Sequence, residues 1–163
     1  MKRIRVLLVD DQGLFREALA TLLGLHSQLE IVGEAGDGEA GVALAQTLRP
    51  DVVLMDLRMP GMSGVEATRR LRSLVPEARV LVLTTFEDDD EVLAAIEAGA
   101  AGYMLKASPA EKLVEAICTV MRGGSPLEPS VASKVMAELA RLSRRQSEAR
   151  CQRLTDPLSA REL

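Results

Sequence analysis

The chain has 163 residues, which is enough for one folded core and a short appendage. Hydrophobic residues make up 47% and charged residues 27%, as in an ordinary globular domain, and the net charge of −4 gives little support to nucleic-acid binding by the whole chain. No apolar run reaches transmembrane length and no signal peptide is visible, so we expect no membrane partner. Cys118 and Cys151 are read as free thiols in a cytoplasmic protein.

Apolar runs and helical repeats alternate over roughly the first 120 residues. We predict strands at residues 4–9, 30–35, 51–55, 79–83 and 101–105, and helices at residues 13–25, 39–48, 65–74, 87–98 and 109–121. The strand runs are continuously apolar, as in a sheet that is buried on both faces. The pattern therefore predicts an α/β fold with a parallel sheet between two layers of helices. Ser108 to Glu111 is read as a capping box, with Pro109 at the first helical position.

The segment from Asp51 to Gly64 carries the first chemical signal. Its apolar run ends at Asp56, and Pro60 and Gly61 then mark a loop. A carboxylate at the carboxyl end of such a strand lies where open α/β sheets bind their ligands. The plain alternative is a carboxylate that simply ends a strand at the solvent.

Polar side chains also follow the neighbouring strands, and right-handed crossovers bring all these strand ends to one edge. They are Asp10, Asp11, Asp56, Thr84 and Lys106. Three adjacent carboxylates would raise at least one pKa unless a cation lay among them, and oxygen ligands favour Mg²⁺. With Lys106 as a second positive charge and Thr84 as a hydroxyl donor, we predict that Asp56 is a nucleophile that forms an aspartyl phosphate. Alternatively, Lys106 is a surface lysine and Thr84 a strand-end cap.

Four segments of the chain resemble the motif set of response-regulator receiver domains, in particular the NarL/FixJ group. They are Val9-Asp10-Asp11, Met55 to Gly61, Leu83-Thr84 and Gly102 to Lys106. The resemblance covers roughly residues 3–121. It implies a five-stranded, doubly wound parallel sheet of the flavodoxin/CheY-like type with strand order 2-1-3-4-5, followed here by a C-terminal linker helix.

The resemblance also implies that a sensor histidine kinase phosphorylates Asp56 in a reaction that requires Mg²⁺. The metal would be held by Asp11, Asp56 and the backbone carbonyl of Arg58, with Asp10 often acting through water. A receiver of this kind is a phosphoacceptor and not an enzyme with an external substrate. Its own chemistry is limited to weak self-phosphorylation and self-dephosphorylation.

Thr84 and Tyr103 match the switch pair of the family, in which the threonine moves towards the phosphoryl group and the aromatic ring follows. The alternative for Tyr103 is a polar aromatic residue that fills a gap between helix and strand.

Two positions depart from the family pattern. Ala107 follows Lys106 where many receivers have proline, which places the cis peptide usual at that position in doubt. Thr85 stands where a small residue is common, and its branched side chain is expected to crowd access to the phosphoryl group on Asp56. Phe86 and Arg58 flank the same entrance to the phosphorylation site. We therefore predict slow hydrolysis of the aspartyl phosphate.

The composition changes after Gly124. We expect a receiver domain at residues 1–122, a linker with an amphipathic helix at 123–153, and the start of a truncated LuxR-type helix-turn-helix DNA-binding domain at 154–163. Ser130 is read as the cap of the linker helix. The apolar stripe of this helix is Val131, Val135, Leu139 and Leu142. Its basic residues are read as a solvated face or as a surface that passes near DNA. Leu158 to Glu162 resembles the opening of the LuxR-type domain.

Three functions are compatible with a carboxylate nucleophile on a sheet of this kind. The leading one is a two-component response regulator that forms a homodimer on phosphorylation and controls transcription through its DNA-binding domain. A stand-alone receiver that signals by protein contacts is the alternative. A phosphatase similar to the haloacid dehalogenases is disfavoured, because that family places a second acid two residues after its nucleophile and here Arg58 follows Asp56 at that spacing.

Overall fold

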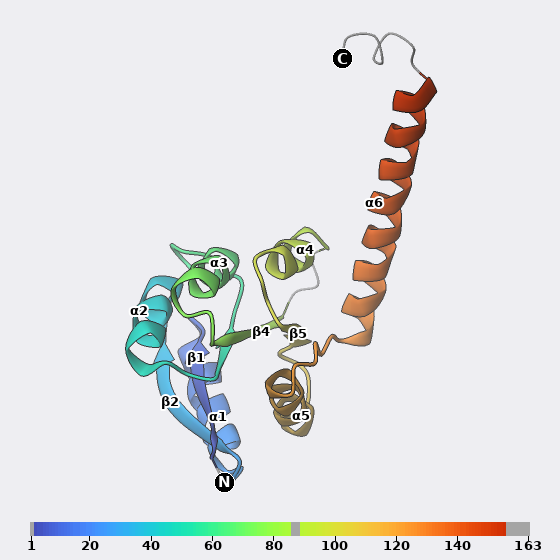
Figure 1. Ribbon diagram of the computed structural model, residues 1–163. Coiled ribbons are helices and arrows are strands. Elements are labelled where there is room, and N and C mark those ends of the chain that lie inside the picture. Colours follow the sequence, from blue (N-terminus) through green and yellow to red (C-terminus); the bar gives the residue numbers. More distant parts are fainter. Residues whose placement is uncertain (1, 86–88, 156–163) are drawn as a thin grey trace. The chain divides into compact units, whose positions relative to one another are not determined.

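Five parallel strands form one sheet in the order β2-β1-β3-β4-β5, with helices connecting them (Figure 1). The computed structural model describes residues 2–85 and 89–155. It divides into two units, residues 1–128 and 129–163, and the sheet belongs to the first. The strands are β1 (Ile4–Val9), β2 (Leu29–Ala35), β3 (Val52–Met55), β4 (Arg79–Thr84) and β5 (Gly102–Leu105). The helices are α1 (Gly13–Gly24), α2 (Gly38–Leu48), α3 (Gly64–Leu74), α4 (Asp89–Glu97), α5 (Ala110–Met121) and α6 (Pro129–Thr155).

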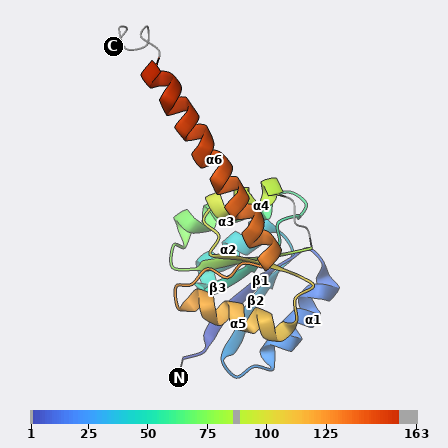
Figure 2. The same cartoon turned by 90° about the vertical axis from the view of Figure 1, so that its right-hand side faces the viewer.

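Helices cover both faces of the sheet. Helices α1 and α5 lie on one face, and α2, α3 and α4 lie on the other (Figure 2). Side chains alternate along each strand, so Val6 and Leu8 of β1 join the core beneath α1 and α5, while Leu7 and Val9 face the opposite layer. All four are at most 1% exposed, which explains why residues 6–9 of this strand are all apolar. The predicted doubly wound parallel sheet, with its strand order, is confirmed.

The predicted strands and helices of this unit agree with the observed ones to within one residue at each end that falls on described residues. The predicted capping box before α5 is wrong. Pro109 is the N-cap of α5, and its side chain makes no capping hydrogen bond. The Ser108 hydroxyl instead donates to Oε1 of Glu128 at 2.6 Å. The capping-box pattern considers only residues 108–111, whereas the acceptor of the Ser108 hydroxyl, Glu128, lies in a later segment.

That later segment runs beside β5, at the edge of the sheet. The amide of Tyr103 donates to the carbonyl of Pro126 at 2.9 Å, and the amide of Glu128 donates to the carbonyl of Tyr103 at 3.1 Å. A β-carbon on Gly102 would lie 2.7 Å from the Pro126 carbonyl oxygen, so glycine permits this close approach. These contacts join the segment up to residue 128 to the first unit.

Helix α6 forms the described part of the second unit. It begins at Pro129, so the prediction that Ser130 caps it is wrong; proline suits a first helical position because its φ is preset and no amide is needed there. Leu139 and Leu142 of the predicted stripe are exposed. No helix in the described ranges is long and apolar enough to cross a membrane. The LuxR-like segment at 158–162 lies outside the described residues.

Candidate functional site

The strand order brings the predicted site residues to one edge of the sheet. Asp10 follows β1 directly, Asp56 follows β3, Thr84 ends β4 and Lys106 follows β5. Strands β1 and β3 pair in register up to their last residues, and the amide of Asp56 donates to the carbonyl of Val9 at 3.0 Å. Across β4 and β5, the amide of Lys106 donates to the carbonyl of Thr84 at 2.8 Å. The backbone ladder therefore sets the spacing of these side chains.

Three carboxylates gather at this edge. One oxygen from each of Asp10, Asp11 and Asp56 lies within 4.8 Å of the others. Asp10 and Asp56 are buried, and Asp11 is exposed. Burial raises the pKa of Asp56 to about 6; Lys106 opposes the rise, and the charges of Asp10 and Asp11 add to it. The predicted pKa rise within the cluster therefore falls on the carboxylate that the sequence assigned as the nucleophile.

Lys106 reaches into the carboxylate cluster, and the reading of this residue as a surface lysine is wrong. Its Nζ lies 2.6 Å from Oδ2 of Asp10 and 3.3 Å from Oδ2 of Asp56, and only 6% of its side chain is exposed. The same ammonium donates to Oε1 of Gln12 at 2.6 Å and lies 4.6 Å from the centroid of the Phe15 ring. Lys106 thus has oxygen partners on three residues and an aromatic ring on a fourth.

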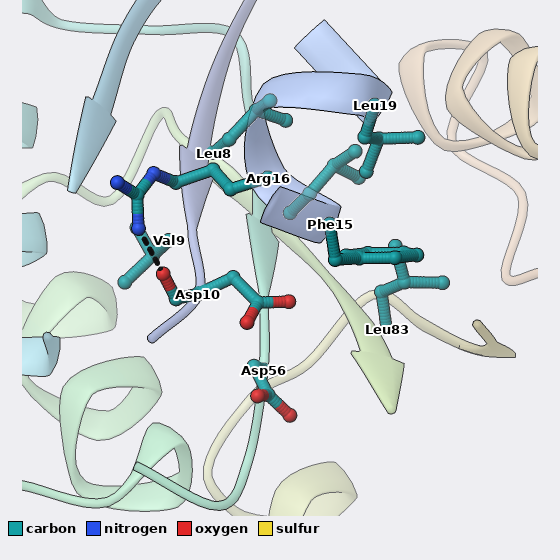
Figure 3. A pocket seen from close by; sticks show the side chains of 9 residues that line it. Leu8, Val9, Asp10, Phe15, Arg16, Leu19, Asp56 and Leu83 are labelled. Atoms are coloured by element: carbon teal, nitrogen blue, oxygen red, sulfur yellow. Dashed lines mark hydrogen bonds between the residues drawn. The ribbon is translucent and has the colours of Figure 1, made fainter. Parts of the chain in front are cut away.

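Figure 3 shows the small pocket beside this cluster. The carboxylates of Asp10 and Asp56 project beyond the ends of their strands, and Phe15 of α1 lies close to Leu83 of β4 (Figure 3). Arg16 fixes the backbone of Asp10, since its Nη1 donates to the Asp10 carbonyl at 2.5 Å. The pocket has room for about 10 Å³, close to the space that one water molecule needs. A pocket of this size is too small for a phosphoryl donor.

Thr84 and Tyr103 are both buried, at 1% and 0% exposure. Tyr103 pairs with Val82 in the ladder between β4 and β5, so the two residues come from adjacent strands. A switch residue in its inward position and a residue that fills a gap are both buried, so burial does not separate these two interpretations of Tyr103.

The loop after β3 is held close to Asp56. The amide of Gly64 donates to the carbonyl of Leu57 at 2.9 Å, and a β-carbon at Gly64 would lie only 2.0 Å from the carbonyl oxygen of Asp56. Glycine is therefore required for the loop to close. The exposed side chain of Arg58 leaves this loop and pairs with Glu91 of α4 at 3.0 Å.

The two departures from the family pattern lie at the same edge. The Lys106–Ala107 peptide is trans, as are all peptide bonds that the structure describes. Thr85 is exposed beside the end of β4. Phe86, which we expected at the same entrance, lies outside the described residues. Slow hydrolysis of an aspartyl phosphate remains a prediction.

Gln12 and Phe15 were not identified from the sequence as site residues. Neither follows a strand directly, and both belong to the start of α1. One signal was present at Gln12: it occupies the N-cap of α1, where serine, threonine, aspartate or asparagine is preferred.

Comparison with known proteins agrees with this geometry. The model of the response regulator receiver domain matches residues 6–118. The transcriptional regulatory protein LiaR of Bacillus subtilis (strain 168) is 47% identical over 136 residues, which are 83% of this chain and 64% of LiaR. The chain therefore spans less than two thirds of the length of this relative.

Solved structures give the same assignment. A two-component response regulator of the LuxR family from Aurantimonas sp. SI85-9A1 has a TM-score of 0.79 and 35% identity, over 85% of this chain and 99% of that one. The signal receiver domain of NarL from Mycobacterium tuberculosis has a TM-score of 0.73 and 37% identity, over 76% of this chain and 99% of that one. From its match, its fold and its acidic site, the chain belongs to the response regulator receiver domain family.

Proposed function

We propose that Asp56 accepts a phosphoryl group from a sensor histidine kinase in a reaction that depends on Mg²⁺. The observation that carries the proposal is the contact of one buried ammonium, on Lys106, with both Asp10 and Asp56 at the carboxyl edge of the sheet. Phosphoryl transfer asks a protein mainly for position and for stabilisation of charge. This edge provides a nucleophile, a cation and a cluster of carboxylates.

The donor set suits a hard divalent cation. Asp10, Asp11 and Asp56 each offer one oxygen within 4.8 Å of the others, and carboxylate oxygens are preferred ligands of Mg²⁺. We assign these three residues, together with the backbone carbonyl of Arg58, as the residues that hold the metal. When bound, Mg²⁺ supplies positive charge that offsets the negative charge of the phosphoryl group.

The side chains of the chain perform the remaining tasks. With a pKa of about 6, Asp56 is mainly ionised at neutral pH and is able to attack phosphorus. In the transfer, the P–N bond of the donor phosphohistidine breaks as a P–O bond to Asp56 forms. Lys106 pairs with the negative oxygens of the phosphoryl group, and the Thr84 hydroxyl donates a hydrogen bond to one of them.

In this proposal, the phosphoryl group changes the positions of Thr84 and Tyr103, and this change alters self-association of the receiver as a homodimer. The output is transcription, through a LuxR-type DNA-binding domain that begins near residue 154. LiaR, a relative that is longer than this chain, is named as a transcriptional regulatory protein, which supports this output.

Intact mass spectrometry tests the acceptor. The chain is incubated with acetyl phosphate, with and without Mg²⁺, beside the variant Asp56→Asn. We expect a gain of about 80 daltons, one phosphoryl group, in the wild type with Mg²⁺ only and no gain in the variant. A wild type that gains no mass, or a variant that gains as much as the wild type, would rule out Asp56 as the acceptor.

A further inference from the structure

Lys106 has two partners that do not belong to the acidic cluster. An ammonium group has three N–H donors. Oxygens of Asp10 and Gln12 each lie 2.6 Å from Nζ, and Oδ2 of Asp56 lies at 3.3 Å. The ring of Phe15 lies on a further side, with its centroid at 4.6 Å. Two of these four partners are carboxylates, and the other two are an uncharged amide and a ring.

Gln12 is an unusual residue for its place in the helix. It is the N-cap of α1, yet its side chain makes no capping hydrogen bond, and its side-chain oxygen Oε1 accepts from Lys106 instead. Its backbone amide donates to Oδ1 of Asp10 at 2.8 Å, so the same residue contacts the acidic cluster as well. Glutamine is not among the preferred caps. A residue that departs from the N-cap preference and contacts a proposed site residue, here Lys106, indicates a functional constraint.

Phe15 adds a contact of a different kind. Its half-buried ring lines the pocket beside Asp10 and Asp56 (Figure 3). The face of an aromatic ring attracts an ammonium, and the attraction increases where water is excluded. With 6% of its side chain exposed, Lys106 meets this condition. A ring is not a ligand for Mg²⁺, and a neutral amide competes weakly against carboxylates for it.

We propose that Gln12 and Phe15 are positioning residues for phosphoryl transfer. They hold the Lys106 ammonium beside Asp56 when Asp10 and Asp56 interact with the metal and the phosphoryl group instead of with Lys106. The inference rests on the proposed function. With Mg²⁺ bound, Asp10 and Asp56 would be its ligands, and Asp56 would also accept the phosphoryl group, so both would be less available to Lys106. The ammonium then loses two of its four partners. The amide oxygen of Gln12 and the ring of Phe15 remain, and they keep Nζ within reach of the phosphoryl oxygens.

The variant Gln12→Ser separates this role from a structural one. Serine is a preferred cap but too short to reach Lys106, so we expect the urea midpoint to stay equal or to rise. The maximal rate of phosphorylation by acetyl phosphate, at saturating Mg²⁺, should fall about tenfold, as expected when a hydrogen bond to a charged group is lost. The donor concentration at half-maximal rate should stay within about twofold, because the contact acts on the transition state.

The variants Phe15→Leu and Phe15→Tyr form the matched pair for the ring. Leucine fills the pocket without a π face, and we expect the maximal rate to fall about threefold. Tyrosine keeps the ring and should restore the rate. Titration calorimetry with Mg²⁺ alone accompanies both series, and a metal affinity close to that of the wild type is expected, because neither residue belongs to the carboxylate cluster.

The outcomes separate the two proposals. If the wild type itself gains no phosphoryl group in this assay, the proposed function fails. If the wild type is phosphorylated while Gln12→Ser and Phe15→Leu keep its maximal rate within about twofold, the positioning role is wrong and the proposed function stands. A rate that falls only together with the urea midpoint in both variants would also overturn the positioning role, because damage to the start of α1 would explain it.

Discussion

Two charge clusters in this protein have similar distances and opposite surroundings. At the carboxyl edge of the sheet, Lys106 lies 2.6 Å from Asp10, and their side chains are 6% and 8% exposed. On α3, Glu66 lies 2.6 Å from Arg69 and 3.3 Å from Arg70, and these three side chains are 40%, 58% and 53% exposed. Water screens the second cluster and is largely excluded from the first.

The carboxylates of the two clusters respond in opposite directions. Burial raises the pKa of Asp56 to about 6, despite Lys106. Hydrogen bonds from Arg70 and then Arg69 lower the pKa of Glu66 below its usual value of 4.5. The charge of Glu66 is thus favoured by its surroundings and the charge of Asp56 is opposed by them. A short ion-pair distance does not establish a favourable ionisation; the access of water decides as much.

The largest expected effect comes from removing the buried cation. Lys106→Met leaves Asp10 and Asp56 without their shared ammonium, and we expect the free energy of unfolding to fall by about 3 kcal/mol near neutral pH. Millimolar Mg²⁺ should restore part of the loss, because a bound cation again offsets the carboxylates. Urea denaturation with and without Mg²⁺ measures both effects.

Arg69→Met is the matched control for the exposed cluster. It removes a cation at the same distance from a carboxylate, and its unfolding midpoint should hardly change with or without Mg²⁺. Equal losses for Lys106→Met and Arg69→Met would contradict the distinction drawn between the two clusters.

The next effect concerns the raised pKa of Asp56. Between its unfolded value of 3.8 and its folded value of about 6, the folded state binds more protons than the unfolded state. The stability that preferential protonation of Asp56 in the folded state provides is fully present below pH 3.8 and is lost as the pH rises through about 6. Asp56→Asn removes this loss of stability at higher pH, because asparagine does not ionise. We expect the variant to be more stable than the wild type by about 1 kcal/mol above neutral pH, after allowance for solvent screening.

A pH series of urea unfolding curves, recorded without divalent cations, measures this difference. It should shrink towards zero as the pH falls below 3.8, where the Asp56 carboxyl is protonated in both states. A difference that is constant over the whole series would mean that the substitution acts through packing or hydrogen bonding and not through the charge of Asp56.

The fold was predictable because its signals are repeated and local. The strands are built around apolar runs, such as Val52 to Met55, and a polar residue marks the carboxyl ends of β1, β3, β4 and β5. Parallel topology then places Asp10, Asp56, Thr84 and Lys106 on one edge without any further information. The gathering of these side chains at one edge therefore followed from the strand pattern, and the family resemblance added the roles that we propose for them.

The parts that sequence reasoning missed depend on contacts between distant segments. Ser108 had the pattern of a cap, but a carboxylate twenty positions later takes its hydroxyl, after the chain returns along β5. Gln12 and Lys106 are 94 positions apart, and no local pattern pairs an amide with an ammonium. Only the fold determines which of several polar partners a side chain reaches.

The smallest effect is expected at the exposed cluster. Hydrogen bonds from Arg70 and Arg69 lower the pKa of Glu66, so its contribution to stability is present above about 4.5 and is lost as the pH falls through its folded pKa. Because the three side chains remain in water, Glu66→Gln should lower the melting temperature at neutral pH by no more than about 2 °C.

High salt provides the decisive comparison for this last variant. It screens exposed pairs far more than buried ones, so the difference between Glu66→Gln and the wild type should vanish in concentrated sodium chloride. The loss caused by Lys106→Met should persist under the same conditions, since its carboxylate partners are only 8% and 7% exposed. If salt removed both differences, solvent would reach the carboxyl edge of the sheet as freely as it reaches α3, and the raised pKa of Asp56 would need a cause other than burial.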